Sequence, residues 1–553
     1  MRNLHCLPLA RSHLLEFAFS QPSTFLLSHI PNFLTLTFVQ NLTAQKVVMA
    51  LVTLAFFIAA PYLISELLNG NTAPLAALLG LGALLLFVFA LGDKCWLSIP
   101  LCLPMGGSIN ILPVKFSPHE LSILLVIGYV FIQFIMTDRR SLTFGPAYIW
   151  VPLLLIAAIL IYQETKGGKL GLNMFGGQGA GGRKTFTILC GMLSLPAILW
   201  FKPPGEKWLR AIPLLYLIGC LLDFAPFLAT SFAPSVAPAV FRIYSSVNLD
   251  AYSSTLVGAN SDLVRVGAIG PTCQAIQLVL LCYFRPKEWI RPSKVFVPVL
   301  SFLALIGTIW GGFRSALFNY LLVSFSSLFF MVRWTALLTI PFVAVLITVL
   351  VLGQGSLFEL PVTMQRTLSP FPGKWSRIAT DSADSSNDFR EAIKRTYRAE
   401  FMKDSGMFGS GYKYSSAFMI SRAQDFYTKN VMADPNAESR DYITARDHHV
   451  GWVAVHHPIG TVGLCLFIFL CLGSLFYVLS NILQTNSSQV SPQKCWSSAL
   501  IIQIVVSFFT VFGAMQHFIP ELCILLAIAI ISFRPPESQI PTKSAQHPAH
   551  SFA

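Results

Sequence analysis

The sequence predicts an all-α, polytopic integral membrane protein, with about 12 to 14 transmembrane helices and a large helical loop outside the cytoplasm. Of its 553 residues, 54% are hydrophobic and only 11% are charged, whereas a soluble domain carries about 25% charged residues. Apolar runs of roughly 20 residues, the length that a helix needs to cross a bilayer, recur along most of the chain. This composition excludes an ordinary soluble enzyme, a disordered protein and a fibrous protein.

The apolar segments are expected to be helices, because a segment exposed to lipid must satisfy its backbone hydrogen bonds internally. One segment has a clear start signal in Ser117-Pro118-His119-Glu120, where serine caps the helix, proline occupies the first turn and glutamate reaches back. The segment at 95–105 is short, which leaves the helix count open. The predicted segments are 46–68, 72–91, 95–105, 118–136, 147–162, 185–201, 211–232, 270–284, 295–310, 315–331, 336–352, 459–479, 496–511 and 515–533.

Clusters of Lys and Arg at 138–140, 202–210, 285–294 and 333 fall on one side of the membrane if every segment crosses it. The positive-inside rule makes that side cytoplasmic. We therefore expect the longer connections to lie outside the cytoplasm, at 163–184, 233–269 and 353–458. The predicted organisation is a cytoplasmic segment 1–45, a transmembrane bundle 46–352, an extracytoplasmic loop subdomain 353–458, C-terminal transmembrane helices 459–533 and a cytoplasmic tail 534–553.

The loop at 353–458 differs in composition from the rest of the chain. The 100 positions 353–452 hold 25 of the 63 charged residues. Within them, 387–404 is predicted to be an amphipathic helix, because Phe389, Ile393, Tyr397 and Phe401 recur every four residues. An ordered subdomain that rests on the membrane is the natural interpretation, since long loops without a purpose are uncommon.

Several other patterns exclude classes of function. The net charge of +13 resides in short clusters, so no basic stripe is available to follow a nucleic-acid backbone. The 11 cysteines contain no CxxC pair, which argues against a disulfide framework or a zinc site. The glycine-rich stretch 177–182 fits GxGxxG but follows no predicted strand, so a nucleotide site is not expected there.

Asp223 lies within an apolar segment and leaves two alternatives open. A carboxylate at that depth is costly and is often functional. The other interpretation is a local cap or pair near Pro226, which breaks the helix.

Two arginines are expected on the outer face. Arg265 directly precedes a predicted span, and Arg314 lies in Gly311-Gly312-Phe313-Arg314-Ser315, where two spans meet. Guanidinium groups bind phosphate oxygens in a bidentate manner, so two of them on one face suggest a diphosphate site. The alternative is that each arginine only anchors its helix at the membrane interface.

Histidines are concentrated where the chain returns from the large loop into a span. The segment reads Asp447-His448-His449-Val450-Gly451-Trp452 and continues with His456-His457-Pro458. Histidine is suited to proton transfer near neutral pH. A metal site is the alternative, but no HExxH pattern accompanies these histidines.

These motifs together resemble the O-antigen ligase and O-antigen polymerase family of membrane glycosyltransferases. His449 is followed after ten residues by Gly460-Thr461-Val462-Gly463, which is the spacing of the family. Gly312-Phe313-Arg314-Ser315 resembles its Arg-Ser element, and 264–271 resembles its Arg-Gly-Pro stretch. The segment from Phe389-Arg390 to the glycine-rich turn 408–412 resembles the Arg-bearing loop helix. The family usually has Asn, Ser or Gln after its histidine, whereas Val450 follows His449, so His448 stays an alternative.

The resemblance implies an enzyme that transfers a glycan from a polyprenyl diphosphate carrier to an acceptor hydroxyl, on lipid A core or a similar molecule, at the outer face of the inner membrane. His449 or His448 would be the catalytic base, and Arg265, Arg314 and Arg390 would bind the diphosphate. It implies no metal and no cofactor. Its partners would be the carrier-linked glycan, the acceptor and membrane lipids, without nucleic acid. Alternatives are a repeat-unit polymerase, a protein O-oligosaccharyltransferase or, from another class, a polysaccharide or lipid transporter or flippase.

Overall fold

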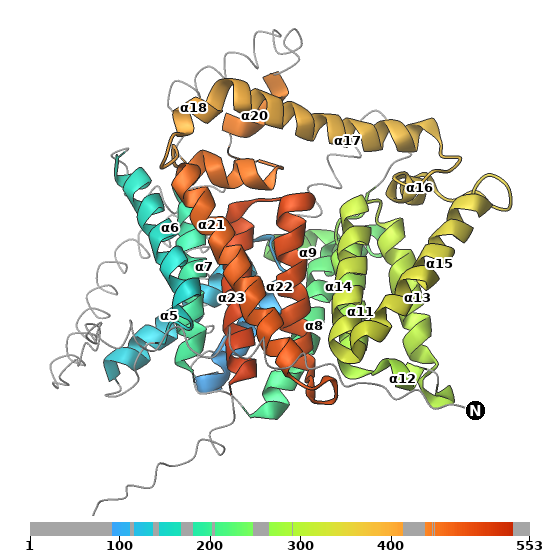
Figure 1. Ribbon diagram of the computed structural model, residues 1–553, viewed down its shortest axis with the longest axis horizontal. Coiled ribbons are helices and arrows are strands. Elements are labelled where there is room, and N and C mark those ends of the chain that lie inside the picture. Colours follow the sequence, from blue (N-terminus) through green and yellow to red (C-terminus); the bar gives the residue numbers. More distant parts are fainter. Residues whose placement is uncertain are drawn as a thin grey trace, which may run out of the picture.

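The computed structural model describes residues 91–110, 116–136, 143–166, 181–201, 205–246, 265–289, 291–412, 437–444, 446 and 448–534. These residues are almost entirely helical (Figure 1). Two short strands are described, β1 (Ser108–Ile109) and β2 (Tyr244–Ser245), and they pair antiparallel with Ser108 opposite Ser245. The predicted segments 1–45 and 46–68, nearly all of 72–91, and the tail from residue 535 lie outside the described residues.

Apart from 95–105, the predicted apolar segments in the described part of the chain become long helices, and two of these, α5 and α23, have the predicted bounds. The long helices are α5 (Pro118–Met136), α6 (Ala147–Lys166), α7 (Gly181–Trp200), α8 (Glu206–Phe232), α11 (Ile269–Tyr283), α13 (Phe296–Trp310), α14 (Arg314–Val332), α15 (Thr339–Gly353), α21 (Gly451–Gln484), α22 (Pro492–Thr510) and α23 (Met515–Phe533). Shorter elements connect them: α9 (Ala237–Ile243), α12 (Pro286–Trp289), η3 (Pro292–Lys294), η4 (Arg333–Leu338) and η7 (Ser487–Gln489).

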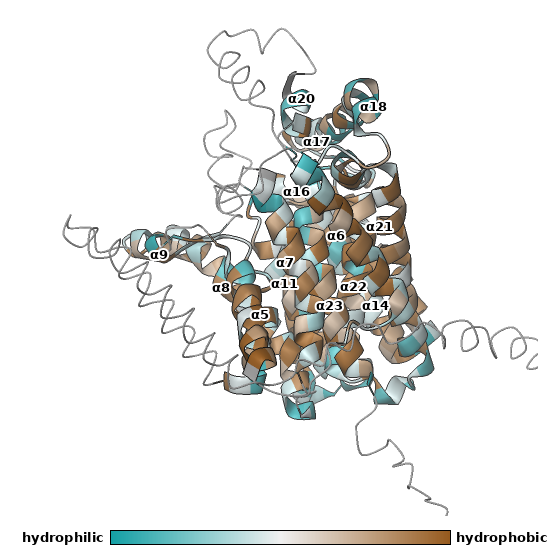
Figure 2. Cartoon of the chain, turned by 90° about the vertical axis from the view of Figure 1, so that its left-hand side faces the viewer, coloured by the Kyte–Doolittle hydropathy of each residue, from teal (hydrophilic) through white to brown (hydrophobic). Residues whose placement is uncertain are grey.

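Seven helical stretches among the described residues are long and apolar enough to cross a membrane, and one of them runs through α14, η4 and α15. Hydrophobic residues dominate the helices between their ends, and hydrophilic residues gather above and below them (Figure 2). These features fit an all-α membrane protein. The predicted total of about 12 to 14 helices includes segments that lie outside the described residues.

The core of the bundle is built around α23, which packs against α7 and α22. Close approach between α23 and α7 depends on Gly191, because a Cβ atom there would lie 2.4 Å from the Pro520 ring. Small residues at helix contacts allow backbones to pack closely, which is how membrane helices gain van der Waals contact. Most of α23 is buried as a result.

The start of α5 is capped as predicted. The backbone N–H of Ser117 donates to Glu120 Oε2 at 3.1 Å, and the N–H of Glu120 donates to Ser117 Oγ at 3.1 Å. The Glu120 carboxylate also pairs with Arg183 of α7, in a buried ion pair, and accepts from Thr187. The cap therefore also ties α5 to α7.

The predicted apolar segment 95–105 is helical only as far as residue 102, in η1 (Gly92–Leu97) and α4 (Ser98–Cys102). It is not among the helical stretches of the described residues that are long and apolar enough to cross a membrane. It packs instead against α8, where a Cβ atom on Gly219 would lie 1.9 Å from the carbonyl oxygen of Leu101.

A layer of helices that we call the roof lies across one end of the bundle (Figure 1). The roof consists of α16 (Val362–Leu368), α17 (Arg377–Thr396), the π-helix η5 (Tyr397–Phe401), α18 (Met402–Ser405) and α20 (Ala437–Thr444). The predicted amphipathic helix 387–404 is confirmed in its apolar face, since Ile393 and Tyr397 are buried in a small core with Ile443 and Val453. Its predicted start is wrong: the helix begins ten residues earlier, at Arg377, with Ser376 as its N-cap. The extra turns are mostly polar, and their buried face consists of the small residues Ala379 and Ala383, which give only a weak apolar pattern.

Helix α21 also begins before its predicted start at residue 459. Its backbone is broken at Gly460, where φ is 70°. The first part, 451–459, lies below the roof, and the second part continues into the bundle (Figure 1). Because of the break, the first part of α21 packs beneath the roof while the second part belongs to the bundle.

Candidate functional site

Four arginines converge between the bundle and α17, and we call them the arginine site. Arg265 precedes α11, Arg314 is the first residue of α14, Arg366 belongs to α16 and Arg390 belongs to α17. The pKa of Arg366 is lowered to about 9, first by burial and then by the charges of the other three arginines. The structure therefore brings the three predicted arginines together and adds Arg366.

The arginine side chains of this site donate hydrogen bonds to residues of α17. Arg265 Nη2 donates to Ser382 Oγ at 2.9 Å. Arg314 Nη2 donates to the carbonyl oxygen of Ala383 at 2.8 Å and to Asn387 Oδ1 at 3.1 Å. Contacts on two successive turns of one helix thus fix where the guanidinium groups lie.

Arg366 was missed by the sequence analysis because it lies among the many charges of the loop and carries no motif. It is only 4% exposed. Its Nε donates to Ser382 Oγ at 3.0 Å, its Nη2 to Ser386 Oγ at 3.1 Å and its Nη1 to the carbonyl oxygen of Gly312. Arg366 therefore connects α17 to the turn that precedes Arg314.

That turn places Arg265 beside Arg314. Gly312 has φ 78°, a left-handed conformation that favours glycine. The N–H of Val266 donates to the carbonyl oxygen of Gly311 at 3.3 Å, which holds the chain on either side of Arg265 against the α13–α14 junction. Sequence-distant cations are brought together by this backbone contact.

Within the described residues, no carboxylate lies within ion-pair distance of any of the four guanidinium groups. The acidic neighbour on α17, Asp381, pairs instead with Arg377 at 3.4 Å. In the described part of the chain, Arg265 Nε is buried without a hydrogen-bond partner and Arg390 makes no hydrogen bond. The charge of Asp384 acts on Arg314 without forming an ion pair. The four guanidinium groups together form a partly buried cationic site, which attracts an anion.

The predicted histidines lie below the other half of α17, and three of their rings are held by internal hydrogen bonds. Arg446 donates to His457 Nε2, and His457 Nδ1 lies 2.8 Å from His448 Nε2. Arginine has no acceptor atom, so His457 carries its proton on Nδ1 and donates it to His448. Tyr397 and Thr461 hydrogen-bond the two ring nitrogens of His456, at 2.6 and 3.1 Å.

His448 and His449 therefore differ in environment. His448 is buried, and its pKa is held well below the usual range by burial and by the charges of Arg446 and Lys184. His449 is half-buried among aromatic rings, with ring-centroid distances of 5.1 Å to Phe512 and 5.3 Å to Tyr442. Partial exposure makes His449 the member of the doublet that an outside hydroxyl can reach.

The arginine site and His449 share one helix as their roof. The ring of Phe389 on α17 lies 5.9 Å from that of His449, and Asn387, two residues earlier, accepts from Arg314. A rise of about 1.5 Å per residue separates these two positions by about 3 Å along α17. Residues i and i+2 lie about 200° apart around a helix, so the cations and His449 border the same short stretch of α17 from opposite flanks.

The glycine-rich turn at 408–412 and the Gly460–Gly463 motif touch each other. The N–H groups of Ser410 and Gly411 donate to the carbonyl oxygens of His457 and Pro458, both at 3.0 Å. A Cβ atom on Gly409 would lie 2.3 Å from the Pro458 backbone. This contact fixes the part of α21 that carries His456 and His457.

Asp223 is buried and accepts hydrogen bonds from Tyr244 and from Ser246, the latter at 2.9 Å. The expected local pairing at a helix break is wrong, because α8 continues through Pro226 and the hydrogen-bond partners follow 21 and 23 residues later. The glycine-rich stretch 177–182 lies mostly outside the described residues. In the ranges that the structure describes, no three His, Cys, Asp or Glu side chains form a group that could hold a metal ion.

No model of a known protein family matches this chain, and a search of curated protein sequences finds no match.

Proposed function

We propose that this protein is a membrane glycosyltransferase that moves a glycan from a polyprenyl diphosphate carrier to an acceptor hydroxyl. The observation that carries the proposal is the arginine site, in which four guanidinium groups lack a carboxylate partner among the described residues. His449 lies within a few residues of it along α17. A diphosphate leaving group and an acceptor that must lose a proton require this combination.

The arginines would act on the leaving group. As the acceptor oxygen bonds to the anomeric carbon, the bond from that carbon to the phosphate oxygen breaks, and its electrons leave with the diphosphate. Preorganised cations stabilise such growing charge more than they stabilise the bound donor, which lowers the barrier. The bonds to Ser382, Ala383 and Asn387 hold two of these guanidinium groups before the donor binds.

His449 would take the proton of the acceptor hydroxyl. A positioned base contributes about 10²- to 10⁴-fold to a rate. The buried chain of Arg446, His457 and His448 supports this assignment, because it engages the neighbouring histidine in the fold and leaves His449 as the half-buried ring.

Several related glycosyltransferase functions share this donor chemistry and differ only in the identity of the acceptor. Transfer to lipid A core, to a growing polysaccharide or to a protein hydroxyl would each use the same cations and base. A transporter or flippase is less well supported, because transporters typically bind substrate near mid-membrane at broken helices, whereas these charged groups gather below the roof at one end of the bundle (Figure 1). In this proposal the enzyme resides in the inner membrane with its roof outside.

Substitution of Arg314 by lysine tests the proposal. Arg314→Lys keeps the charge but removes the planar fork that holds two phosphate oxygens, so we expect glycan transfer and binding of polyprenyl diphosphate to fall at least about tenfold. Arg377→Lys on exposed α17 surface is the matched control and should behave as the wild type. Both quantities are measured on purified protein in detergent. Equal activity of the two variants would contradict a diphosphate site at Arg314.

A further inference from the structure

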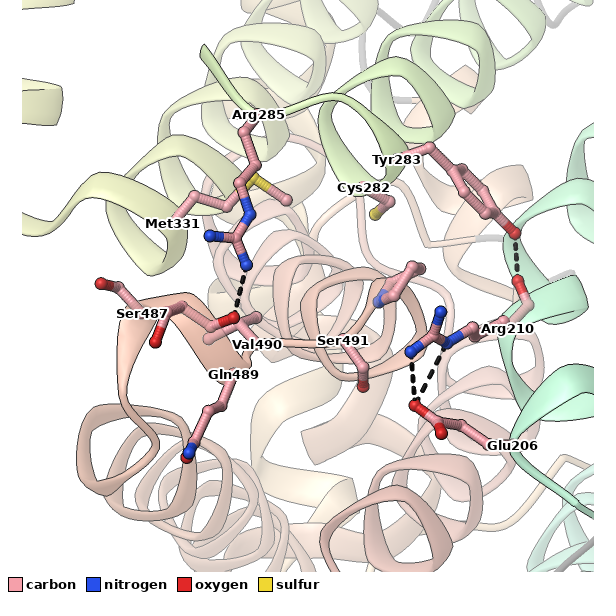
Figure 3. Close-up of a pocket in the computed structure, with 12 residues that line it drawn as sticks. Glu206, Arg210, Cys282, Tyr283, Arg285, Met331, Ser487, Gln489, Val490 and Ser491 are labelled. Carbon is pink, nitrogen blue, oxygen red and sulfur yellow. Dashed lines mark hydrogen bonds and ion pairs between the residues drawn. The ribbon is translucent and has the colours of Figure 1, made fainter. Parts of the chain in front are cut away.

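A cavity of about 430 Å³ opens at the end of the bundle opposite the roof (Figure 3). It lies at the far ends of the helices that begin at the arginine site. Helix α11 starts four residues after Arg265 and ends at Tyr283, which lines the cavity, and α14 runs from Arg314 to the lining residue Met331. Helices of these lengths rise about 22 to 28 Å, so the cavity belongs to the other membrane face.

One guanidinium group in this cavity has no carboxylate partner. Arg285 is exposed, donates to the carbonyl oxygen of Ser488, and makes no ion pair with any described residue. Arg210, on the other side of the cavity, is neutralised by Glu206, with contacts of 2.6 and 3.1 Å to one carboxylate oxygen. Figure 3 shows the two arginines at separate edges of the cavity. The net charge of the lining is therefore positive.

A helix N-terminus also borders the cavity. Ser491 is the N-cap of the 19-residue helix α22, and Pro492 is its first residue; both line the cavity. The Ser491 side chain makes no capping hydrogen bond, and its hydroxyl is buried without a partner in the described part of the chain. An uncapped N-terminus of a long helix carries partial positive charge, which suits an anion.

The remaining lining shows what else the ligand would contact. Cys282, Met331 and Val490 provide apolar surface, and the side chains of Ser487 and Gln489 add polar groups near the rim. A volume above about 300 Å³ accommodates more than a bare ion. The lining therefore suits an anion that is attached to a small organic group.

We propose that this cavity binds a phosphate ester, with Arg285 and the Ser491 end of α22 holding the phosphate and the apolar lining holding its substituent. A tetrahedral phosphate accepts from a guanidinium fork and from a helix end at once. The ester can come from the headgroup of an anionic lipid in the leaflet at this face, or from a soluble metabolite. This site is separate from the proposed transfer reaction and does not depend on it.

Thermal unfolding of the purified full chain in neutral detergent tests the proposal, because a ligand that binds the folded state raises the unfolding midpoint with its concentration. Short-chain phosphatidylglycerol, glycerol 3-phosphate and succinate are titrated at constant ionic strength. The variants are Arg285→Gln, Ser491→Ala and, as the matched control, Arg291→Gln, which changes an exposed arginine on the same face that does not line the cavity. Because Ser491 makes no capping bond, its replacement removes no cap.

We expect saturable stabilisation of the wild type and of Arg291→Gln by phosphatidylglycerol, with binding at least about tenfold weaker in Arg285→Gln and also weaker in Ser491→Ala. An equal response to glycerol 3-phosphate supports a soluble ester, and a response to the lipid alone supports a headgroup. If Arg285→Gln and Arg291→Gln respond alike, or if succinate stabilises as well as the phosphate esters, the proposal is overturned. None of these outcomes depends on glycan transfer, so the two proposals can fail separately.

Discussion

Neighbouring residues in this protein have different chemical environments. His448 is enclosed by Arg446 and His457, whereas His449, the next residue, faces a half-exposed group of aromatic rings. The arginines follow the same principle, since Arg366 uses its guanidinium internally while Arg390 makes no hydrogen bond in the described part of the chain. Roles at this level follow from the burial of each group and from the contacts that surround it.

Alanine replacement of each histidine separates these roles. His449→Ala is expected to reduce glycan transfer about 10²- to 10⁴-fold through loss of a base, with donor binding and the unfolding midpoint nearly unchanged. His448→Ala should lower stability by about 1 to 3 kcal/mol, because the buried N–H of His457 loses its acceptor. His456→Ala and His457→Ala should retain more transfer activity than His449→Ala. Transfer, carrier binding and thermal unfolding are measured on the same preparations.

If His448→Ala loses transfer while its unfolding midpoint and donor binding are unchanged, the base is His448 and not His449. If all four alanine variants remain active, none of these four histidines is the base.

The buried His448 also makes stability depend on pH. Its pKa in the fold lies well below the ordinary value because of burial and nearby cations, whereas the unfolded chain has a pKa near 6.5. The unfolded state therefore binds the extra proton, so this contribution is complete above about pH 6.5 and is lost as the pH falls, by about 1.4 kcal/mol per pH unit. Unfolding midpoints measured between pH 7 and 5 should fall less steeply in His448→Asn. An unchanged slope would show that His448 does not titrate on unfolding.

At the level of secondary structure, α17 and the break in α21 organise the site. Helix α17 spans both groups of functional residues, since Ser382 and Asn387 contact the arginines and Phe389 contacts His449. The glycine-rich turn 408–412 and the segment around the break at Gly460 are joined by backbone hydrogen bonds. The roof is thereby fixed to the bundle on the histidine side.

Glycine replacements measure this contact. A Cβ atom on Gly460 would lie 2.3 Å from the backbone nitrogen of Gly409, and its φ of 70° is unfavourable for alanine. Gly406→Ala is the control, because Gly406 has φ 50° but nothing within 4 Å of a Cβ atom. We expect Gly406→Ala to cost about 1 to 2 kcal/mol from backbone conformation alone and Gly460→Ala to cost clearly more and to impair transfer. Unfolding midpoints of the two variants check this. Equal values would show that the backbone around Gly409 shifts to accommodate the Cβ atom at little cost in stability.

The whole molecule separates its charges between two ends. The roof and the arginine site lie at one end, and the exposed Arg285 lines the cavity at the other (Figures 1 and 3). The apolar helices between them have the length of a bilayer. Both proposed sites are thus at membrane surfaces, and the positive-inside rule predicts which surface is which.

Cysteine labelling in intact cells tests this orientation. Ser385, exposed on α17, and Ser293, exposed in η3, lie at opposite ends of the bundle. With an impermeant thiol reagent, Ser385→Cys should be labelled and Ser293→Cys should be protected until the cells are opened. The reverse pattern would place the roof in the cytoplasm and would remove the basis for an outer-leaflet donor.

Local features of the sequence were enough to predict where most of the long helices of the bundle lie. An apolar run or a capping box acts over a few residues, so the bounds of α5 and α23 and the bonds of Ser117 and Glu120 follow from the adjacent sequence. The choice of Arg265, Arg314, Arg390 and the histidine pair rested on motif spacing. The structure agrees that these residues gather below one helix, and their chemical roles remain proposals.

Contacts between distant segments determined the features that the sequence analysis did not predict. Arg366 joins the site through Gly312, 54 residues away, and the Asp223 carboxylate meets Ser246 across 23 residues. The early turns of α17 include Ser382, whose hydroxyl accepts hydrogen bonds from both Arg265 and Arg366. Hydrogen bonds of this kind have no period and no local propensity, because a polar side chain gains its partner only when two separate segments fold together. The sequence could therefore propose a cationic site, but only tertiary packing determined how many arginines form it and which histidine remains half-exposed.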